Sequence, residues 1–175
     1  NDDDCLDDNP GLHGTAVSSI ISETLNYDYI SVPHQIMPLK ICNADGKASY
    51  FNFLCALNYA LDRRVPVLQM SLGWYDNDSG DLVDSIFLDL MNDYPNTTIV
   101  CSAGNDASNN DDNVHCPSGY TIDNIIAVAS CNYSKTDISS WSNYGDESVD
   151  FFAVGENISF SGISIEGTSF AAPKV

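Results

Sequence analysis

The chain of 175 residues has few basic side chains. Six lysines and arginines stand against 25 aspartates and glutamates, which gives a formal net charge of −19. Nucleic-acid binding requires lysine and arginine to neutralise phosphates, and a strongly acidic protein repels such a partner. No apolar run approaches the roughly 18 residues of a membrane-spanning helix. The composition therefore argues against nucleic acid as a partner and against a membrane span.

Several short motifs are also absent. The six cysteines include no Cys-x-x-Cys pair, which argues against zinc and thioredoxin-type redox sites. The chain starts at Asn1 without the basic and apolar segments of a signal peptide. An even number of cysteines is compatible with a disulfide-bearing protein, so we expect a secreted or extracytoplasmic location. Cys55 and Cys101 could equally be buried thiols, and the spacing does not reveal any pairing.

Most of the acidic residues are aspartates in loop-like segments, such as residues 76–78 and 111–112. The simpler interpretation is a solvated acidic surface. The alternative is calcium bound by loop carboxylates, although no Asp-x-Asp-x-Asp-Gly loop with a closing glutamate is present. We expect that no cofactor is required, assign no metal ligands, and leave structural calcium open.

Apolar residues follow helical and strand spacings in turn along the chain. Offsets of three and four predict helices over residues 16–25, 49–61 and 82–91. In the second helix, the stripe expected to be buried consists of Phe51, Leu54, Ala56, Leu57 and Leu61. Compact apolar runs predict strands over residues 35–41, 65–72, 97–103, 125–130 and 149–154.

Strands separated by helices predict an α/β fold with a parallel sheet and right-handed crossovers. No repeat, linker or low-complexity segment divides the sequence, so residues 1–175 form one domain. In open parallel sheets the functional groups gather beyond the carboxyl ends of the strands. Residues 71–73 and 104–105 each follow a predicted strand, and Ser169 follows the last extended segment. We therefore expect these residues to share one sheet edge.

Four sequence blocks carry a family resemblance. They are His-Gly-Thr at residues 13–15, Met-Ser-Leu-Gly at 70–73, Ser-Ala-Gly-Asn at 102–105 and Gly-Thr-Ser-Phe-Ala-Ala-Pro at 167–173. In this order and at these separations, the blocks resemble those of the subtilisin-like serine proteases. The resemblance covers essentially the whole chain, and it implies a three-layer fold with helices on both faces of a mostly parallel sheet.

The resemblance also implies a role for each block. Ser169 would attack the peptide carbonyl and form an acyl-enzyme, while His13 would act as the general base. The side-chain amide of Asn105 would donate to the oxyanion. Residues 71–73 would pair with the backbone of a polypeptide substrate, and residues 102–104 would form a wall of the primary pocket. The implied substrate-binding residues are Ser71, Leu72, Gly73, Ser102, Ala103 and Gly104.

Each of these residues also has a simpler interpretation. His13 alone would be a structural histidine, Ser169 a helix N-cap, and Asn105 part of a turn. Their joint occurrence in family order favours protease ancestry. His34 and His115 lack such support and are interpreted as loop residues. The resemblance aligns residues 115–117 near the primary pocket, although loop lengths differ, and we expect a broad preference for a sizeable apolar side chain in that pocket.

The sequence departs from the family pattern at two places. Ala16 stands where the family has a second histidine, and the aspartate that orients the catalytic histidine is missing. Only twelve residues precede His13, and Asp7 and Asp8 are too near it in sequence to fold back as that aspartate. We therefore interpret the chain, which ends at Val175, as an internal fragment incomplete at both ends. We expect it to be inert or nearly so by itself, within a parent endopeptidase.

Two other functional classes stay open. The first is a catalytically inactive pseudoprotease or peptide-binding module, because the triad aspartate is not found in this sequence. The second is an acidic, calcium-dependent structural module in which the motifs are coincidental. A propeptide or an inhibitor is a further expected partner of a protease, beside its polypeptide substrates.

Overall fold

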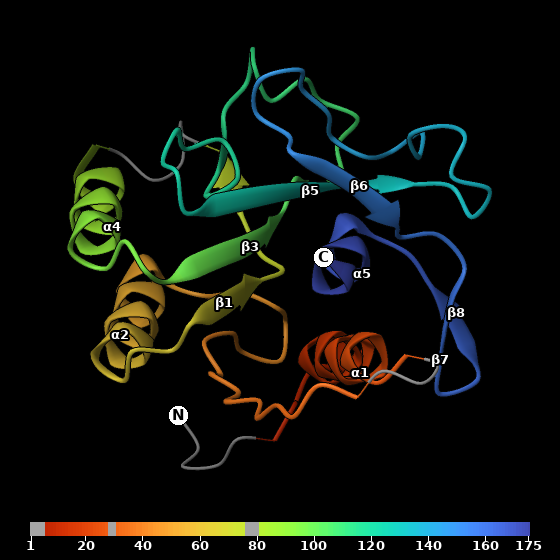
Figure 1. Ribbon diagram of the computed structural model, residues 1–175, viewed down its shortest axis with the longest axis horizontal. Coiled ribbons are helices and arrows are strands. Elements are labelled where there is room, and N and C mark those ends of the chain that lie inside the picture. The colour runs from red at the N-terminus through yellow and green to blue at the C-terminus, as the bar shows by residue number, and fades with distance from the viewer. Residues whose placement is uncertain (1–5, 28–30, 76–80) are drawn as a thin grey trace.

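The computed structural model describes residues 6–27, 31–75 and 81–175 (Figure 1). The helices are α1 (His13–Leu25), α2 (Tyr50–Asp62), α4 (Asp81–Asp93) and α5 (Thr168–Ala171), and the 3-10 helix η1 (Ala172–Lys174) follows α5 directly. The strands are β1 (Val67–Met70), β2 (Trp74–Tyr75), β3 (Thr98–Ser102), β4 (His115–Cys116), β5 (Ile125–Cys131), β6 (Phe151–Val154), β7 (Ile158–Phe160) and β8 (Ile163–Ile165). Within the described ranges, no helix has the length and apolar character needed to cross a membrane.

The central sheet has the strand order β1-β3-β5-β6, and all its neighbouring strands are parallel. Its register pairs Met70 with Cys101 and Cys101 with Ala127, so the carboxyl ends of β1, β3 and β5 lie at one edge. The pairs β2–β4 and β7–β8 are short and antiparallel. The predicted α/β class with a parallel sheet is confirmed.

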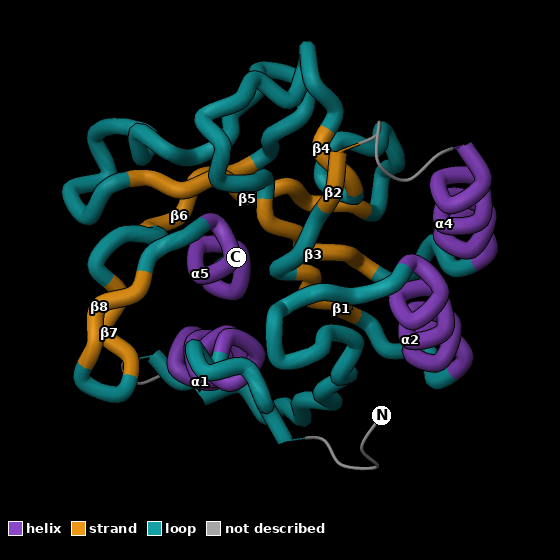
Figure 2. The backbone as a smooth tube through the Cα atoms, turned by 180° about the vertical axis from the view of Figure 1, so that it is seen from behind, coloured by secondary structure: helices purple, strands orange, loops and turns teal. Residues whose placement is uncertain are grey.

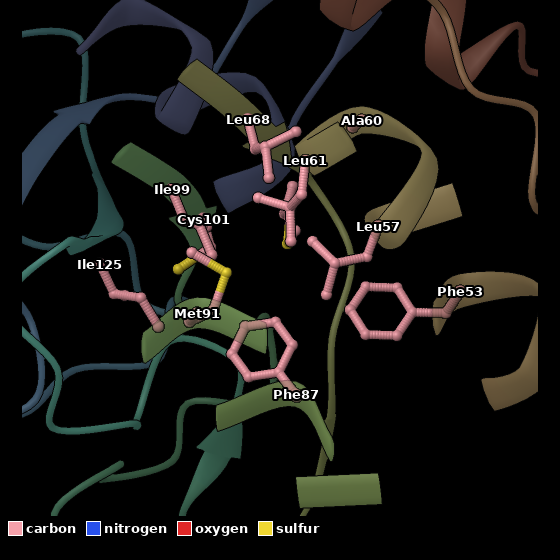
Figure 3. Packing of buried hydrophobic residues seen from close by; sticks show 11 residues of the cluster. Phe53, Leu57, Ala60, Leu61, Leu68, Phe87, Met91, Ile99, Cys101 and Ile125 are labelled. Atoms are coloured by element: carbon pink, nitrogen blue, oxygen red, sulfur yellow. The ribbon is translucent and has the colours of Figure 1, made fainter. Parts of the chain in front are cut away.

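Helices cover both faces of the sheet, which confirms the expected three layers. Helices α2 and α4 lie on one face, and α1 lies beside α5 on the other (Figures 1 and 2). Alternate strand residues serve the two faces: Ile99 and Cys101 pack with α2 and α4, whereas Val100 and Val128 pack with α5 and η1. Figure 3 shows the larger cluster, in which Phe87 packs among side chains of α2 and of the strands. Burial on both faces explains the continuous apolar runs.

Helix α2 begins where its sequence provides a cap. The Ser49 hydroxyl accepts a hydrogen bond from the Asn52 backbone N–H at 3.1 Å, which satisfies one of the first N–H groups of the helix. Its buried residues are Phe53, Leu57, Ala60 and Leu61. The stripe expected from the sequence was thus wrong in part, since Phe51 is 75% exposed. Residues two apart on a helix point to nearly opposite faces, so Phe51 and Phe53 could not both face the core.

The strand expected over residues 35–41 was wrong, because the structure has no strand there. Pro38 lies in the middle of this segment and has no backbone N–H to donate to a ladder. Leu39 and Ile41 nevertheless pack at the rim of the larger cluster, where they line a hollow together with Leu68 and Met70 of β1. The apolar signal in this segment therefore reports contact with the core rather than a strand.

The described cysteines are thiols, and no disulfide joins them. They are Cys42, Cys55, Cys101, Cys116 and Cys131, while Cys5 lies outside the described residues. Cys101 is completely buried in β3, as one alternative proposed, and burial raises the pKa of its thiol. The same expectation was wrong for Cys55, which is exposed. The structure thus gives no support to export inferred from an even cysteine count.

Candidate active site

His13 is the first residue of α1, where an unusual cap holds the chain. The preceding residue, Leu12, is in the left-handed region with φ of 49° and makes no side-chain cap. Asp7 provides the cap instead: its Oδ2 accepts hydrogen bonds from the backbone N–H and the hydroxyl of Thr15, at 2.9 and 3.0 Å. The His13 ring lies 5.5 Å from that of Phe170, measured between centroids. This contact places the imidazole beside the residue that follows Ser169.

The environment of His13 favours its neutral form. Burial lowers the pKa of the imidazole, and the negative charge of Asp7 opposes this in part. A neutral imidazole is the form that can accept a proton. Asp7 folds back over the start of α1, although not as the orienting aspartate. It bonds to Thr15 and makes no hydrogen bond to His13, so the role of the orienting aspartate stays unassigned.

Ser169 is the second residue of α5, after a sharp turn at Gly167. Gly167 has φ of 147° and is the N-cap of α5, so the alternative that Ser169 is an N-cap was wrong. Two hydrogen bonds link Ser169 to the end of β1. The Ser71 hydroxyl donates to the Ser169 carbonyl at 2.7 Å, and the Ser169 hydroxyl donates to the Ser71 carbonyl at 3.4 Å. No hydrogen bond joins His13 to Ser169 among the described residues.

Asn105 lies just past the end of β3, with its amide held by the start of α5. Its Oδ1 accepts hydrogen bonds from the backbone N–H and from the hydroxyl of Thr168, both at 2.9 Å. A backbone N–H can only donate, so the amide oxygen must face Thr168. The Nδ2 group of Asn105 is therefore available as a donor. It belongs to an amide held by Thr168, the residue before the predicted nucleophile Ser169. Asn105 is exposed, so this donor is accessible.

The two predicted substrate-binding segments lie side by side. Residues 71–73 follow β1 and residues 102–104 end β3, and these strands are neighbours in the sheet. The Gly104 backbone N–H donates to the Thr168 hydroxyl at 3.3 Å, which ties the second segment to α5 as well. The segments 71–73 and 102–105 thus lie with Ser169 near the carboxyl ends of β1 and β3, and His13 is linked to them through its ring contact with Phe170. Their chemical roles remain predictions.

His115 is the site residue that the sequence analysis misjudged. It is in β4, only 6% exposed, and not in a loop; His34 is exposed in irregular structure, as expected. Burial lowers the pKa of His115 to about 4, against a small opposing effect of Asp106. A Cβ added at Gly73 would lie 2.2 Å from the His115 ring, so the ring packs directly on that backbone. The sequence did contain a signal for this contact: Gly73 and Gly104, in two of the four family blocks, leave room for a ring to pack against the backbone.

Metal ligands are not grouped in the described part of the chain. No cluster of three or more histidine, cysteine, aspartate or glutamate side chains there is arranged to bind a metal ion. The carboxylate of Asp111 accepts hydrogen bonds from the backbone N–H groups of Asp146, Glu147 and Ser148. The Ser148 side chain and then these N–H groups lower the pKa of Asp111 in spite of some desolvation. Residues 76–78, also considered for calcium, lie outside the described residues. Structural calcium stays an untested prediction.

Comparison with curated proteins gives relatives that are proteases. The chain is 29% identical to subtilisin-like protease 2 of Plasmodium falciparum over 93% of the chain and 13% of that protein. It is 29% identical to the major intracellular serine protease of Bacillus subtilis over 99% of the chain and 55% of that protein. The chain therefore spans no more than about half the length of these relatives. The names of two relatives describe intracellular enzymes, so the expected secretion finds no support in them.

Solved structures and a family profile agree with this result. A cold-adapted subtilisin-like serine proteinase is 25% identical and matches with a TM-score of 0.74 over 99% of this chain and 61% of that one. A lanthipeptide protease, 22% identical, shares the fold with a TM-score of 0.71 over 93% of this chain and 57% of that one. The profile of the subtilase family (peptidase S8) matches residues 1–175. The chain belongs to the subtilase family.

Proposed function

We propose that this chain carries the nucleophile, the general base and the oxyanion donor of a serine endopeptidase. The observation that carries the proposal is the orientation of Asn105. Thr168, the residue before Ser169, donates two hydrogen bonds of 2.9 Å to the amide oxygen of Asn105. The orientation of the amide is thereby fixed, and Nδ2 is left as a donor. A preorganised donor aimed at developing negative charge is usually the largest electrostatic contribution to acyl transfer.

The chemistry follows from the positions of these groups. The Ser169 hydroxyl attacks the carbonyl carbon of the peptide bond while His13 takes its proton. The carbonyl oxygen becomes negative and accepts a hydrogen bond from Asn105 Nδ2. When the intermediate collapses, the C–N bond breaks, and His13 gives the proton to the leaving amine. Water then attacks the acyl-enzyme with the same base, which releases the acid and restores Ser169.

The substrate would bind as an extended polypeptide. Residues 71–73 continue from β1 as backbone beside the nucleophile, and a substrate segment pairing with them would bring its carbonyl to Ser169. Residues 102–104 would form the opposite wall. Such pairing uses main-chain hydrogen bonds, so it selects extended polypeptides of many sequences. A propeptide or protein inhibitor could bind in the same way, and this partner stays a prediction.

The missing aspartate sets the expected rate. No carboxylate in the described residues hydrogen-bonds to His13, so the base is not oriented by this part of the chain. In subtilisin, removing the aspartate alone costs about 3 × 10⁴ in turnover, or about 6 kcal/mol. We therefore expect weak or undetectable turnover from these 175 residues alone and efficient turnover from a protein that also supplies this carboxylate.

The test is covalent labelling by a fluorophosphonate, which reacts with an activated serine. The protein that contains this chain should be labelled at Ser169, and Ser169→Ala should abolish the signal. Asn105→Ala should slow labelling by about 10²-fold, the range found when one oxyanion donor is removed. Ser164→Ala, which changes an exposed serine of β8, should be labelled like the native protein. Labelling that persists in Ser169→Ala contradicts the proposal.

One observation favours a second candidate, a peptide-binding pseudoprotease. The Ser169 hydroxyl donates to the Ser71 carbonyl at 3.4 Å rather than to His13. A serine held in this way is not activated by the base. If the protein binds extended peptides but does not react with the fluorophosphonate, the pseudoprotease is the correct assignment.

A further inference from the structure

The position of the substrate side chain follows from the site itself. In the proposed function, the reacting carbonyl lies between Ser169 Oγ and Asn105 Nδ2. If residues 71–73 pair with the substrate backbone and residues 102–104 form the opposite wall, as proposed above, the side chain preceding the cleaved bond lies between the ends of β1 and β3. Gly73 lies beyond the end of β1 and Gly104 beyond the end of β3, so these two glycines define the sides of that space. Whatever lies between them determines which side chains fit.

The imidazole of His115 lies between these two glycines. A Cβ added at Gly73 would be 2.2 Å from His115 Cε1 and 2.4 Å from Nε2. A Cβ added at Gly104 would meet the Asn143 amide first and would be 3.2 Å from His115 Cδ2. One ring therefore touches both sides, with its Cε1–Nε2 edge at Gly73 and its Cδ2 at Gly104. A substrate side chain entering between the two segments meets this ring.

Several contacts hold the ring in place. The Ser118 hydroxyl donates to the His115 carbonyl at 2.8 Å, so it accepts the 2.9 Å hydrogen bond from Nδ1–H. The Tyr75 ring meets the imidazole edge to face, 5.3 Å between centroids. Tyr75 is itself fixed, since its hydroxyl donates to Asp106 at 2.7 Å and accepts from Asn143 Nδ2 at 3.1 Å. Swinging the ring aside would break the Ser118 bond and the contact with Tyr75.

This arrangement assigns the tautomer of His115. Because Nδ1 carries the proton, Nε2 is an unprotonated acceptor, and it has no hydrogen-bond partner within the described ranges. The low pKa of the buried ring agrees with a neutral imidazole at neutral pH. The ring is thus uncharged, and it occupies the space that a substrate side chain would enter. It offers neither the depth that a large apolar group needs nor a charge that would attract a basic one.

We propose that His115 is a specificity-determining residue that makes the primary pocket shallow. The pocket admits glycine, alanine or serine before the cleaved bond and excludes leucine and phenylalanine. This inference rests on the proposed function for the position of the substrate, and it replaces the sizeable apolar side chain expected from the sequence. A single misfitting methylene changes specificity roughly 10- to 200-fold. We therefore expect a preference of about 10²-fold for alanine over phenylalanine.

The test measures binding without requiring chemistry. Tetrapeptides that differ only in their C-terminal residue, alanine, leucine or phenylalanine, are titrated calorimetrically into the Ser169→Ala variant of the protein. The alanine peptide should bind at least tenfold more tightly than the phenylalanine peptide. Adding His115→Ala should open the space and reverse this order, while His34→Ala, a change at an exposed histidine, should leave it unchanged.

Each outcome decides the inference. Equal or tighter binding of the phenylalanine peptide by Ser169→Ala overturns it, as does binding of none of the peptides. The same order after His115→Ala overturns it too, provided that the variant melts cooperatively. If the variant with His115→Ala does not fold, the order of peptide affinities measured with Ser169→Ala alone still decides. Fluorophosphonate labelling tests the proposed function separately, so a pocket that selects alanine in a protein that is not labelled supports His115 and refutes the peptidase.

Discussion

The two faces of the sheet are packed in opposite ways. On the face covered by α2 and α4, large side chains such as Phe53, Phe87 and Met91 fill the space between helices and strands (Figure 3). On the other face, α5 and η1 meet the strands through Ala171 and Ala172, which are completely buried. Small residues let a helix backbone come close to the sheet, whereas large ones keep the layers apart.

This difference separates stability from function. The α2–α4 face mainly buries apolar area, although Leu72, at the edge of the site, also packs against its cluster. On the α5 face, the close approach allows Thr168 to bond to Asn105, and Gly104 to bond to Thr168, at the edge of the sheet. The loops around this edge also contain buried polar groups. Asn143, completely buried, accepts from the Asp106 backbone N–H at 2.8 Å and donates to Asn110 at 2.9 Å. Geometry is fixed there by hydrogen bonds, which specify direction as well as contact.

The largest expected effect is on the α2–α4 face. Phe87 is fully buried, and its ring centroid lies 5.1 Å from that of Tyr120 and 6.0 Å from that of Phe53. Phe87→Ala should lower the free energy of unfolding by about 3–5 kcal/mol, through lost burial and a cavity. Urea unfolding measures this loss. Phe51→Ala, at a 75% exposed position of α2, should change the free energy of unfolding by less than about 0.5 kcal/mol. Equal losses would contradict the burial pattern.

The second-largest expected effect is the pH dependence of stability caused by His115, at the edge of the site. The pKa of His115 is about 4 in the folded protein, against an ordinary value of 6.5. Between these values the unfolded chain binds a proton that the folded protein does not, so stability falls as the pH decreases from 7 to 4. This histidine alone accounts for a loss of up to about 3 kcal/mol.

Comparing His115→Asn with the native protein isolates this contribution. Urea unfolding at several pH values should show a smaller acid loss in His115→Asn, because asparagine does not titrate. His34→Asn, at an exposed position, should keep the native dependence. A native protein that is as stable at pH 4 as at pH 7 contradicts the assignment of a buried neutral imidazole.

Overpacking the α5 face tests the role of its small residues. Ala171→Leu inserts a larger side chain where α5 meets the sheet and should cost about 1–3 kcal/mol in the free energy of unfolding. It should also slow fluorophosphonate labelling of Ser169, because the shifted helix carries Thr168 and the nucleophile with it. Ala44→Leu, in an exposed turn, is the matched control and should change neither quantity. Unaltered labelling in Ala171→Leu would mean that close packing does not position the site.

The smallest effect concerns the cap of α1. Asp7→Asn removes the negative charge that raises the pKa of His13, so this pKa should fall further below its ordinary value. The imidazole C–H resonance followed by NMR over a pH titration measures the change. Loss of the charge at the helix N-terminus should cost less than about 1 kcal/mol in stability. Asp45→Asn, in the exposed turn after residue 43, should leave the His13 titration unchanged, and a rise in the His13 pKa would contradict the sign.

Much of the fold could be predicted because strand and helix periodicities are local properties. The runs that became β1, β3, β5 and β6 were placed within a few residues, and so were the three longer helices. The failures were tertiary in origin. Residues 35–41 are apolar because Leu39 and Ile41 contact the core. In α2, Phe53 is buried in the core, whereas Phe51 is exposed. An apolar residue at a permissible spacing does not reveal which neighbour it will meet.

The candidate site divides in the same manner. The motifs named His13, Asn105 and Ser169, and the predicted strands placed Asn105 and Ser169 at one sheet edge, since parallel strands put their carboxyl ends together. Only the folded structure decided that Thr168 orients the Asn105 amide, that Asp7 caps α1, and that His115 lies between Gly73 and Gly104. A sequence determines which groups are available and the secondary structure that carries them. Contacts between residues 40 or 60 positions apart depend on strand order and on how closely each helix packs, and these become fixed only when the whole domain folds.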